Sequence, residues 1–174
     1  MHAMSHVTTI GSRLAAFCLL AAMLLFTSAC SSDDTFDTEQ LFGQYTFDEF
    51  FFEPDAELPN TDLLEELTAV DLEFFRGGEF SLRYRFPGQT GSTNARGTFT
   101  TGSNDVRLTV NNPADHTDLF LPETFRLTIE EDGDRLIRDI RREGLNLQST
   151  RYTRYSGIRD ADGTLTMRLT RVDS

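Results

Sequence analysis

The sequence predicts an all-β fold: an antiparallel up-and-down meander that closes into a barrel, with one short helix after the first strand. Apolar and polar residues alternate along several segments, most clearly over residues 79–86. One side of that segment would carry Phe80, Leu82, Tyr84 and Phe86. Short turn sequences, such as Gly77-Gly78 and Asp132-Gly133, separate these segments. Because an open sheet exposes unpaired edges, a long meander protects them best by closing.

The strands follow one another in chain order. We expect them over residues 43–52, up to residue 75, and over residues 79–86, 97–101, 106–110, 125–129, 150–155 and 165–169. Residues 60–68 differ, because polar capping residues precede leucines that share one helical face. This helix would either plug the core or cover one end as a lid. Phe50, Phe51 and Phe52 cannot all face inward from one strand, so at least one is exposed or covered by the helix.

The first 30 residues have the pattern of an export signal. Arg13 precedes an apolar run over residues 14–26, and small residues lie directly before Cys30. The run is roughly 13 residues long, shorter than the ~20 that a helix needs to cross a bilayer, so a cleaved signal is expected. Residues 26–30, FTSAC, resemble the lipobox of bacterial lipoproteins, with Thr27 where leucine is usual. The alternative is ordinary secretion with an unmodified cysteine.

The lipoprotein resemblance implies three parts. Residues 1–29 would be the cleaved signal peptide, residues 30–40 the lipidated Cys30 with a polar tether, and residues 41–174 the barrel domain. In this family the cysteine carries several acyl chains, which together hold a protein stably on a membrane. The expected location is therefore the cell envelope. Ser31 after the cysteine favours the outer membrane, facing the periplasm or the cell surface.

The composition excludes several functions. Asp and Glu number 28, all 16 basic residues are arginine, and the formal net charge is −12. Nucleic acid is not an expected partner, because phosphate binding needs a basic surface. The absence of lysine excludes Schiff-base and lysine-nucleophile chemistry. Cys30 would be the only cysteine of the mature chain, so no disulfide can form within it.

The barrel segment resembles bacterial lipocalin-like domains. The similar stretches are residues 41–45 (LFGQY), 72–80, 95–108 and 163–172. Tyr45 stands where lipocalins keep a tryptophan, and either Arg168 or Arg171 would be the arginine that closes the barrel. The resemblance implies a cup of roughly eight to ten strands that binds a small apolar or amphipathic ligand.

The candidate ligand-binding residues are apolar side chains expected to face inward. They are Phe80, Leu82, Tyr84, Phe99, Phe125 and Leu127. The alternative is a filled barrel in a structural or accessory envelope lipoprotein that binds a protein partner. A run of arginines could hold an anionic head group or carboxylate, although pairing with neighbouring acids is favoured. These arginines are Arg135, Arg138, Arg141, Arg142, Arg151 and Arg154.

The sequence offers little for catalysis or metal binding. His116 is the only histidine after the predicted signal, and an exposed loop position is expected for it. No Gly-x-Ser-x-Gly motif accompanies it. Residues 131–134 and 160–163 resemble parts of calcium loops but lack the remaining ligands, so turns explain them. We therefore expect a non-catalytic protein without metal or cofactor.

Overall fold

The computed structural model describes residues 36–112 and 116–172, so the predicted signal peptide and Cys30 lie outside the described residues. The strands are β1 (Gly43–Pro54), β2 (Thr61–Asp62), β3 (Ala69–Phe74), β4 (Glu79–Arg85), β5 (Thr93–Thr101), β6 (Asp105–Val110), β7 (Thr124–Glu130), β8 (Arg135–Leu145) and β9 (Ala161–Arg171). The helical elements are α2 (Leu63–Glu66) and the 3₁₀ turns η1 (Thr38–Leu41), η3 (Thr117–Leu119), η4 (Glu131–Gly133), η5 (Leu147–Ser149) and η6 (Thr153–Tyr155).

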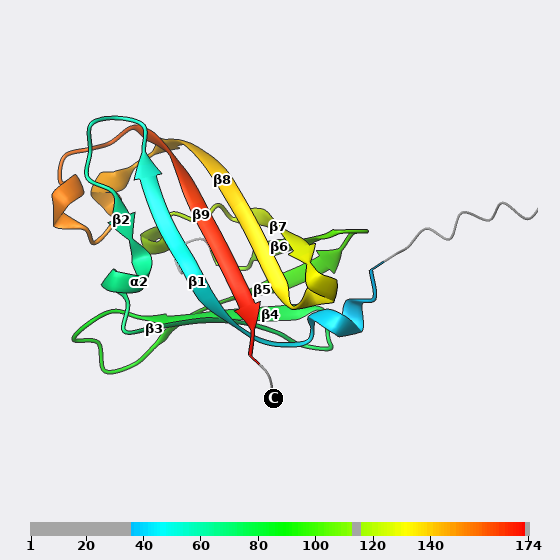
Figure 1. Ribbon diagram of the computed structural model, residues 1–174. Helices are drawn as coiled ribbons and strands as arrows, with labels where there is room; N and C mark the ends of the chain where they lie inside the picture. The colour runs from blue at the N-terminus through cyan, green and yellow to red at the C-terminus, as the bar shows by residue number, and fades with distance from the viewer. Residues whose placement is uncertain (1–35, 113–115, 173–174) are drawn as a thin grey trace, which may run out of the picture. The chain divides into compact units, whose positions relative to one another are not determined.

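Eight of the strands form a closed antiparallel barrel. From β3 to β9, each strand pairs with the next strand in the chain, and β1 pairs with both β3 and β9. Figure 1 shows β1, β9 and β8 side by side, crossing in front of β3, β4 and β5. The short strand β2 pairs with the part of β1 that β3 leaves free. The predicted meander, its closure and the short helix after the first strand are confirmed.

Alternation along the strands fills the barrel interior. In β4, for example, Phe80, Leu82 and Tyr84 are buried, and Glu79 and Arg83 are exposed. The inward residues of all eight strands join one hydrophobic core. Burial of apolar surface on this scale is the main stabilising contribution to a fold of this size.

A bulge in β1 changes which residues face inward. The register with β9 shifts between Phe47 and Glu49. Tyr45 faces inward before the bulge, and Phe50 and Phe52 face inward after it, all with 0% exposure. Phe51 faces out and is half-buried, beside Asp62 of β2. The prediction that the three phenylalanines do not all face inward is confirmed, and the strand β2 supplies part of the cover.

Two predicted elements differ from the structure. The predicted helix over residues 60–68 is a single turn, because Thr61–Asp62 pairs with β1 and the Asp62 carboxylate caps α2 by accepting from the Leu64 amide. The strand predicted over residues 150–155 is wrong. This segment contains η6, and Tyr152 and Tyr155 turn inward onto the barrel end, where ring packing replaces strand pairing. The predicted tether also ends early, since Phe36 packs on the core and Thr38–Leu41 forms η1.

A buried tyrosine and an arginine close one end of the barrel. The Tyr45 hydroxyl donates to the Gly133 carbonyl at 2.6 Å. The Arg171 guanidinium lies 5.7 Å from the centre of the Tyr45 ring and donates to the carbonyls of Gln40 and Phe42. Of the two arginines that the resemblance left open, Arg171 is therefore the one at this end. Leu41, fully buried, completes the closure.

We expect Gly97→Ala to destabilise the barrel strongly. A methyl group at Gly97 would lie 2.0 Å from the Thr109 carbonyl oxygen and 2.6 Å from the Phe80 ring. Overpacking of this kind costs roughly 1–3 kcal/mol or more. Gly77→Ala is the matched control, because nothing lies within 4 Å of its added methyl group. Urea unfolding of both variants tests the expectation, and equal midpoints would contradict it.

We expect alkaline pH to weaken the fold through Tyr45. Burial raises the pKa of Tyr45 to about 12, above the value of about 10 in an unfolded chain. The contribution of neutral Tyr45 to the free energy of unfolding is therefore complete below about pH 10 and is lost as the pH rises through about 12. The chain has no lysine to titrate in this range.

Urea midpoints measured from about pH 9 to about pH 12 should fall less steeply in Tyr45→Phe than in the wild type. Some slope should remain, because burial also raises the pKa of Tyr152. Thr100→Val removes a hydroxyl from an exposed outer position and should keep the wild-type slope. If the urea midpoint of Tyr45→Phe fell with pH as steeply as that of the wild type, the assignment of the pH dependence to Tyr45 would be wrong.

Candidate functional site

The six predicted ligand-binding residues all face the barrel interior. Their side chains are at most 6% exposed, and they belong to one core. Neighbouring rings pack edge to face, for example Phe74 with Phe99 at 4.9 Å between centroids. Leu82, Tyr84, Phe99 and Leu127 border none of the main hollows found on the described residues. Phe125 borders a hollow between β7 and β8, and Phe80 borders a hollow on the outer side of β3–β5.

Loops and turns cover the end of the barrel opposite Tyr45. Phe120 stacks on Phe52 at 4.3 Å and on Tyr152 at 5.3 Å between ring centroids. Phe120 adopts a left-handed backbone conformation (φ 58°), which places its ring over the barrel end. Arg151 lies 3.8 Å from the centre of the Phe86 ring. This end is therefore sealed by aromatic side chains.

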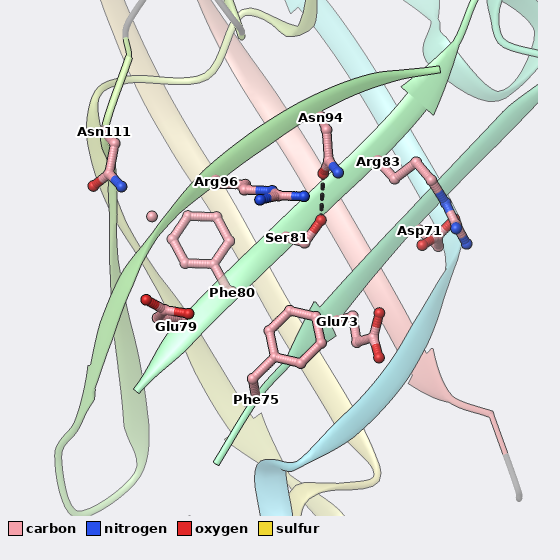
Figure 2. A pocket seen from close by; sticks show the side chains of 11 residues that line it. Asp71, Glu73, Phe75, Glu79, Phe80, Ser81, Arg83, Asn94, Arg96 and Asn111 are labelled. Carbon is pink, nitrogen blue, oxygen red and sulfur yellow. Dashed lines mark hydrogen bonds and ion pairs between the residues drawn. The ribbon is translucent and has the colours of Figure 1, made fainter. Parts of the chain in front are cut away.

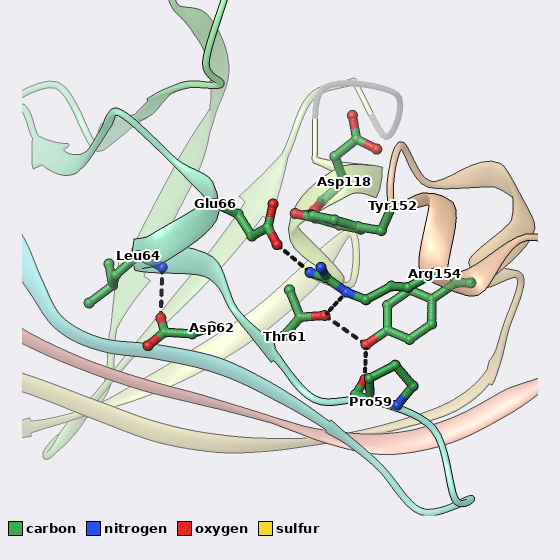
Figure 3. Close-up of polar contacts among 9 residues, drawn as sticks. Pro59, Thr61, Asp62, Leu64, Glu66, Asp118, Tyr152 and Arg154 are labelled. Carbon is green, nitrogen blue, oxygen red and sulfur yellow. Dashed lines mark hydrogen bonds and ion pairs between the residues drawn. The ribbon is translucent and has the colours of Figure 1, made fainter.

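A polar network ties the same end to α2 and β2 (Figure 3). The Tyr155 hydroxyl contacts Thr61 Oγ1 at 2.6 Å and donates to the Pro59 carbonyl at 2.6 Å. Arg154 donates to the Glu66 carboxylate at 2.6 Å and to Thr61 Oγ1 at 3.3 Å. Thr61 and Tyr155 are fully buried. Because buried polar groups must be paired, these contacts hold η6 in one position against β2 and α2.

Another hollow lies outside the barrel, on β3, β4 and β5 (Figure 2). Its volume is about 580 Å³, and its walls are mainly polar. Asp71 and Arg83 form an ion pair at 3.0 Å on one side. Glu73, Glu79 and Arg96 bring charges of both signs into it. An exposed, mixed-charge surface of this kind suits contact with a polar partner better than enclosure of an apolar molecule.

The barrel wall opens between β7 and β8. These strands share three residue pairs, the last being Thr128 with Ile137. From Arg138 onward β8 stays paired with β9 but has no described strand on its other side. We call the gap between residues 122–126 and residues 138–142 the seam. A hollow of about 450 Å³ lies in it, lined from both sides, and Phe125 and Ile140 supply apolar wall.

A second hollow of about 220 Å³ adjoins the seam. It shares Pro122 with the first hollow and is lined by apolar residues, including Leu121, Leu145 and Leu147. Arg142 also lines it. The two hollows thus follow the outer edge of the core, from the seam to the covered barrel end. This combination of apolar wall with a few polar groups is typical of small-molecule sites.

The arginine run divides into paired and unpaired members. Arg135 pairs with the local acids Glu130 and Glu131, as the favoured interpretation expected. Arg141 and Arg154 also pair with acids, but with Asp55 and Glu66, which are distant in the sequence. Arg151 lies on the Phe86 ring. No ion pair among residues 36–112 and 116–172 involves Arg138 or Arg142. The sequence signal for this was that every second residue from 136 to 142 is Leu, Arg, Ile and Arg, which predicts apolar and cationic side chains on one face of a strand.

His116 is buried rather than exposed. Its side chain is 3% exposed, because the residue begins η3, whose Leu119 packs into the core. It borders the second hollow, near Arg142. No group of three or more His, Cys, Asp or Glu residues among the described residues is placed to hold a metal ion. The calcium-like residues 131–134 form η4 and its cap, and Asp162 accepts from the Gly144 amide at 2.9 Å.

Comparison with solved structures finds similar chains, including two from Bacteroides species. A lipocalin-like protein from Bacteroides uniformis is 14% identical with a TM-score of 0.43, over 76% of this chain and 99% of that one. An uncharacterized protein from Bacteroides eggerthii is 14% identical with a TM-score of 0.36, over 75% of this chain and 98% of that one. No family model and no curated protein matches. Similarity this low carries no argument about function, and the strand pairing itself establishes the barrel.

Proposed function

We propose that this chain is a membrane-anchored envelope lipoprotein whose barrel binds a small apolar or amphipathic molecule without catalysing a reaction. The observation that carries the binding function is the seam. There, Phe125 of the core and the partly buried Ile140 border a hollow between two wall strands. Its volume, about 450 Å³, lies within the roughly 300–1,000 Å³ of typical ligand pockets.

The two ends of the barrel make the seam the best route to the core. Tyr45, Arg171 and Leu41 close one end. Phe120 and Tyr152 cover the other. Entry at either end would require breaking buried ring contacts and hydrogen bonds. At the seam, by contrast, entry would break no strand pairing, because β7 and β8 are no longer paired there.

The proposed location is the cell envelope, on the outer membrane. This part of the proposal rests on the residues around Cys30. Within the described residues, no helix is long and apolar enough to span a bilayer. Acyl chains on Cys30 would supply the attachment in the proposed arrangement. A short tether before η1 would keep the barrel close to the lipid surface, where amphipathic molecules are concentrated.

A second candidate function is contact with a protein partner through the outer hollow on β3–β5. Phe75 is 40% exposed at this hollow, and charges of both signs surround it. An exposed aromatic within a polar rim is typical of protein contact surfaces. This alternative requires no ligand in the barrel, so ligand measurements separate the two functions.

The anchor is tested by labelling with a fatty-acid analogue in a bacterial host that expresses the full chain. We expect label on the wild-type protein and none on Cys30→Ser. Cys18→Ser is the matched control and should keep the label, because Cys18 lies within the predicted signal peptide. Label that persists in Cys30→Ser would refute lipidation at this residue.

Ligand binding is tested by native mass spectrometry of the chain from Ser31 onward, exported to a periplasm and purified without detergent. Residues 34–174 form a unit with its own core, so this chain retains the whole barrel. We expect an additional mass that is lost on denaturation.

A seam variant and its control sharpen this test. Thr124→Trp should reduce the bound mass, because Thr124 lines the seam and an indole would occupy it. Thr98→Trp, on the exposed outer face of β5, should not. A wild-type mass without ligand that stays unchanged after soaking with fatty acids would favour the protein-partner function instead.

A further inference from the structure

The inner face of β8 carries two arginines where the barrel wall opens. The register with β9 places Arg138 opposite Met167 and Arg142 opposite Gly163. Directly opposite residues of an antiparallel pair face the same side of the sheet. Met167 is 2% exposed and belongs to the core. Both arginines therefore extend from the inward face of the wall, at the positions where β7 no longer covers it.

Neither guanidinium group forms an ion pair among the described residues, although Asp139, which is paired with Arg168, also interacts electrostatically with Arg138. Arg138 is exposed toward the seam, and Arg142 is half-buried in the adjoining hollow. The Nε atom of Arg142 is buried without a hydrogen-bond acceptor in the described part of the chain. Burial lowers the pKa of this guanidinium. A desolvated cation without a counter-charge is costly, so an anion at this place would be bound favourably.

Other charges at the seam are also mainly positive. Arg107 and Arg126 lie directly opposite each other on β6 and β7, an arrangement that is unfavourable for like charges. Arg126 is offset by Asp105 at 2.8 Å, whereas no ion pair of the described residues involves Arg107. The acids that line the two hollows are Asp139 and Glu123, and Asp139 is already paired with Arg168 at 2.9 Å. In a chain of net charge −12, this local excess of cations points to an anionic ligand.

We propose that Arg138 and Arg142 bind the oxyanion head of an amphipathic ligand at the seam, with its apolar chain against Phe125, Ile140 and Leu121. The inference rests on the proposed function and adds the chemical class of the ligand, a single-chain carboxylate or phosphate. Guanidinium groups suit this role because they donate paired hydrogen bonds to carboxylate and phosphate oxygens. The apolar residues alone would bind a neutral ligand equally well. The arginines therefore add the preference for an anionic head group.

The test is calorimetric titration of the detergent-free chain with three probes of equal length: laurate, dodecyl phosphate and 1-dodecanol. We expect the wild type to bind at least one anion more tightly than the alcohol. Arg138→Gln and Arg142→Gln should each weaken anion binding about tenfold to a hundredfold, the range for a charge-assisted hydrogen bond. Binding of 1-dodecanol should change less than about threefold in the same variants, since it has no charge to lose.

Two further variants control for charge and geometry. Arg135→Gln removes the same charge from the same strand, but Arg135 pairs with Glu131 away from the seam, so anion binding should stay at the wild-type level. Arg142→Lys keeps the charge and loses the planar fork, so its affinity should lie between those of the wild type and Arg142→Gln. The comparison of laurate with dodecyl phosphate distinguishes a carboxylate ligand from a phosphate head group.

A second readout does not depend on added ligand. Arg142→Met should raise the urea midpoint of the ligand-free protein, because it removes a half-buried cation that lacks a partner. Equal binding of alcohol and anions, with no loss in the arginine variants, would overturn the anion site while leaving the proposed binding function intact. Absence of binding for all three probes would overturn both.

Discussion

The pairing of β1 with β9 is the constraint on which the barrel depends. It runs from Tyr45 opposite Arg171 to Pro54 opposite Gly163 and joins the two ends of the meander. Without it, both strands would expose unpaired edges and the interior would be open to water along one side. The bulge after Phe47 adapts β1 to this closure. Tyr45 and Phe50 are an odd number of residues apart, and the bulge lets both face inward. The Tyr45 hydroxyl and Arg171 then fix the end of the barrel where this pairing begins.

Closure also explains where the wall is weakest. β8 remains paired with β9 as far as Leu145 opposite Ala161, but it leaves β7 after Ile137. Beyond this point, β8 and the loop before β7 line the same two hollows, and no described strand pairs with this edge of β8. Arginine is tolerated on the inner face of β8 there because its apolar stem can lie along the wall while the guanidinium reaches the opening. The same residues inside a fully paired wall would be buried at a much higher cost.

The alternation of apolar and polar residues predicted most strands, because each exposes one face to water and packs the other in the core. It failed where packing depends on distant segments. Residues 150–155 alternate like a strand, yet Tyr152 and Tyr155 fold over the barrel end and pack on Phe120. His116 follows a polar stretch, yet the packing of Leu119 draws it into the interior. β8 is only partly apolar, so its role as a wall strand follows from its pairing with β9 more than from its own composition.

The sequence by itself determined the all-β meander, the inward set from Phe80 to Leu127, the net negative charge and the absence of lysine. These follow from local periodicity and composition, which do not depend on what lies across the barrel. Only the tertiary structure decided that Arg171 rather than Arg168 lies at the closed end, that both ends are covered, and that Arg138 and Arg142 meet at an opening in the wall. The physical reason is that strand register, and the place where two strands separate, are set by pairing between residues far apart in the chain. The residues of one strand do not determine which residues lie opposite them.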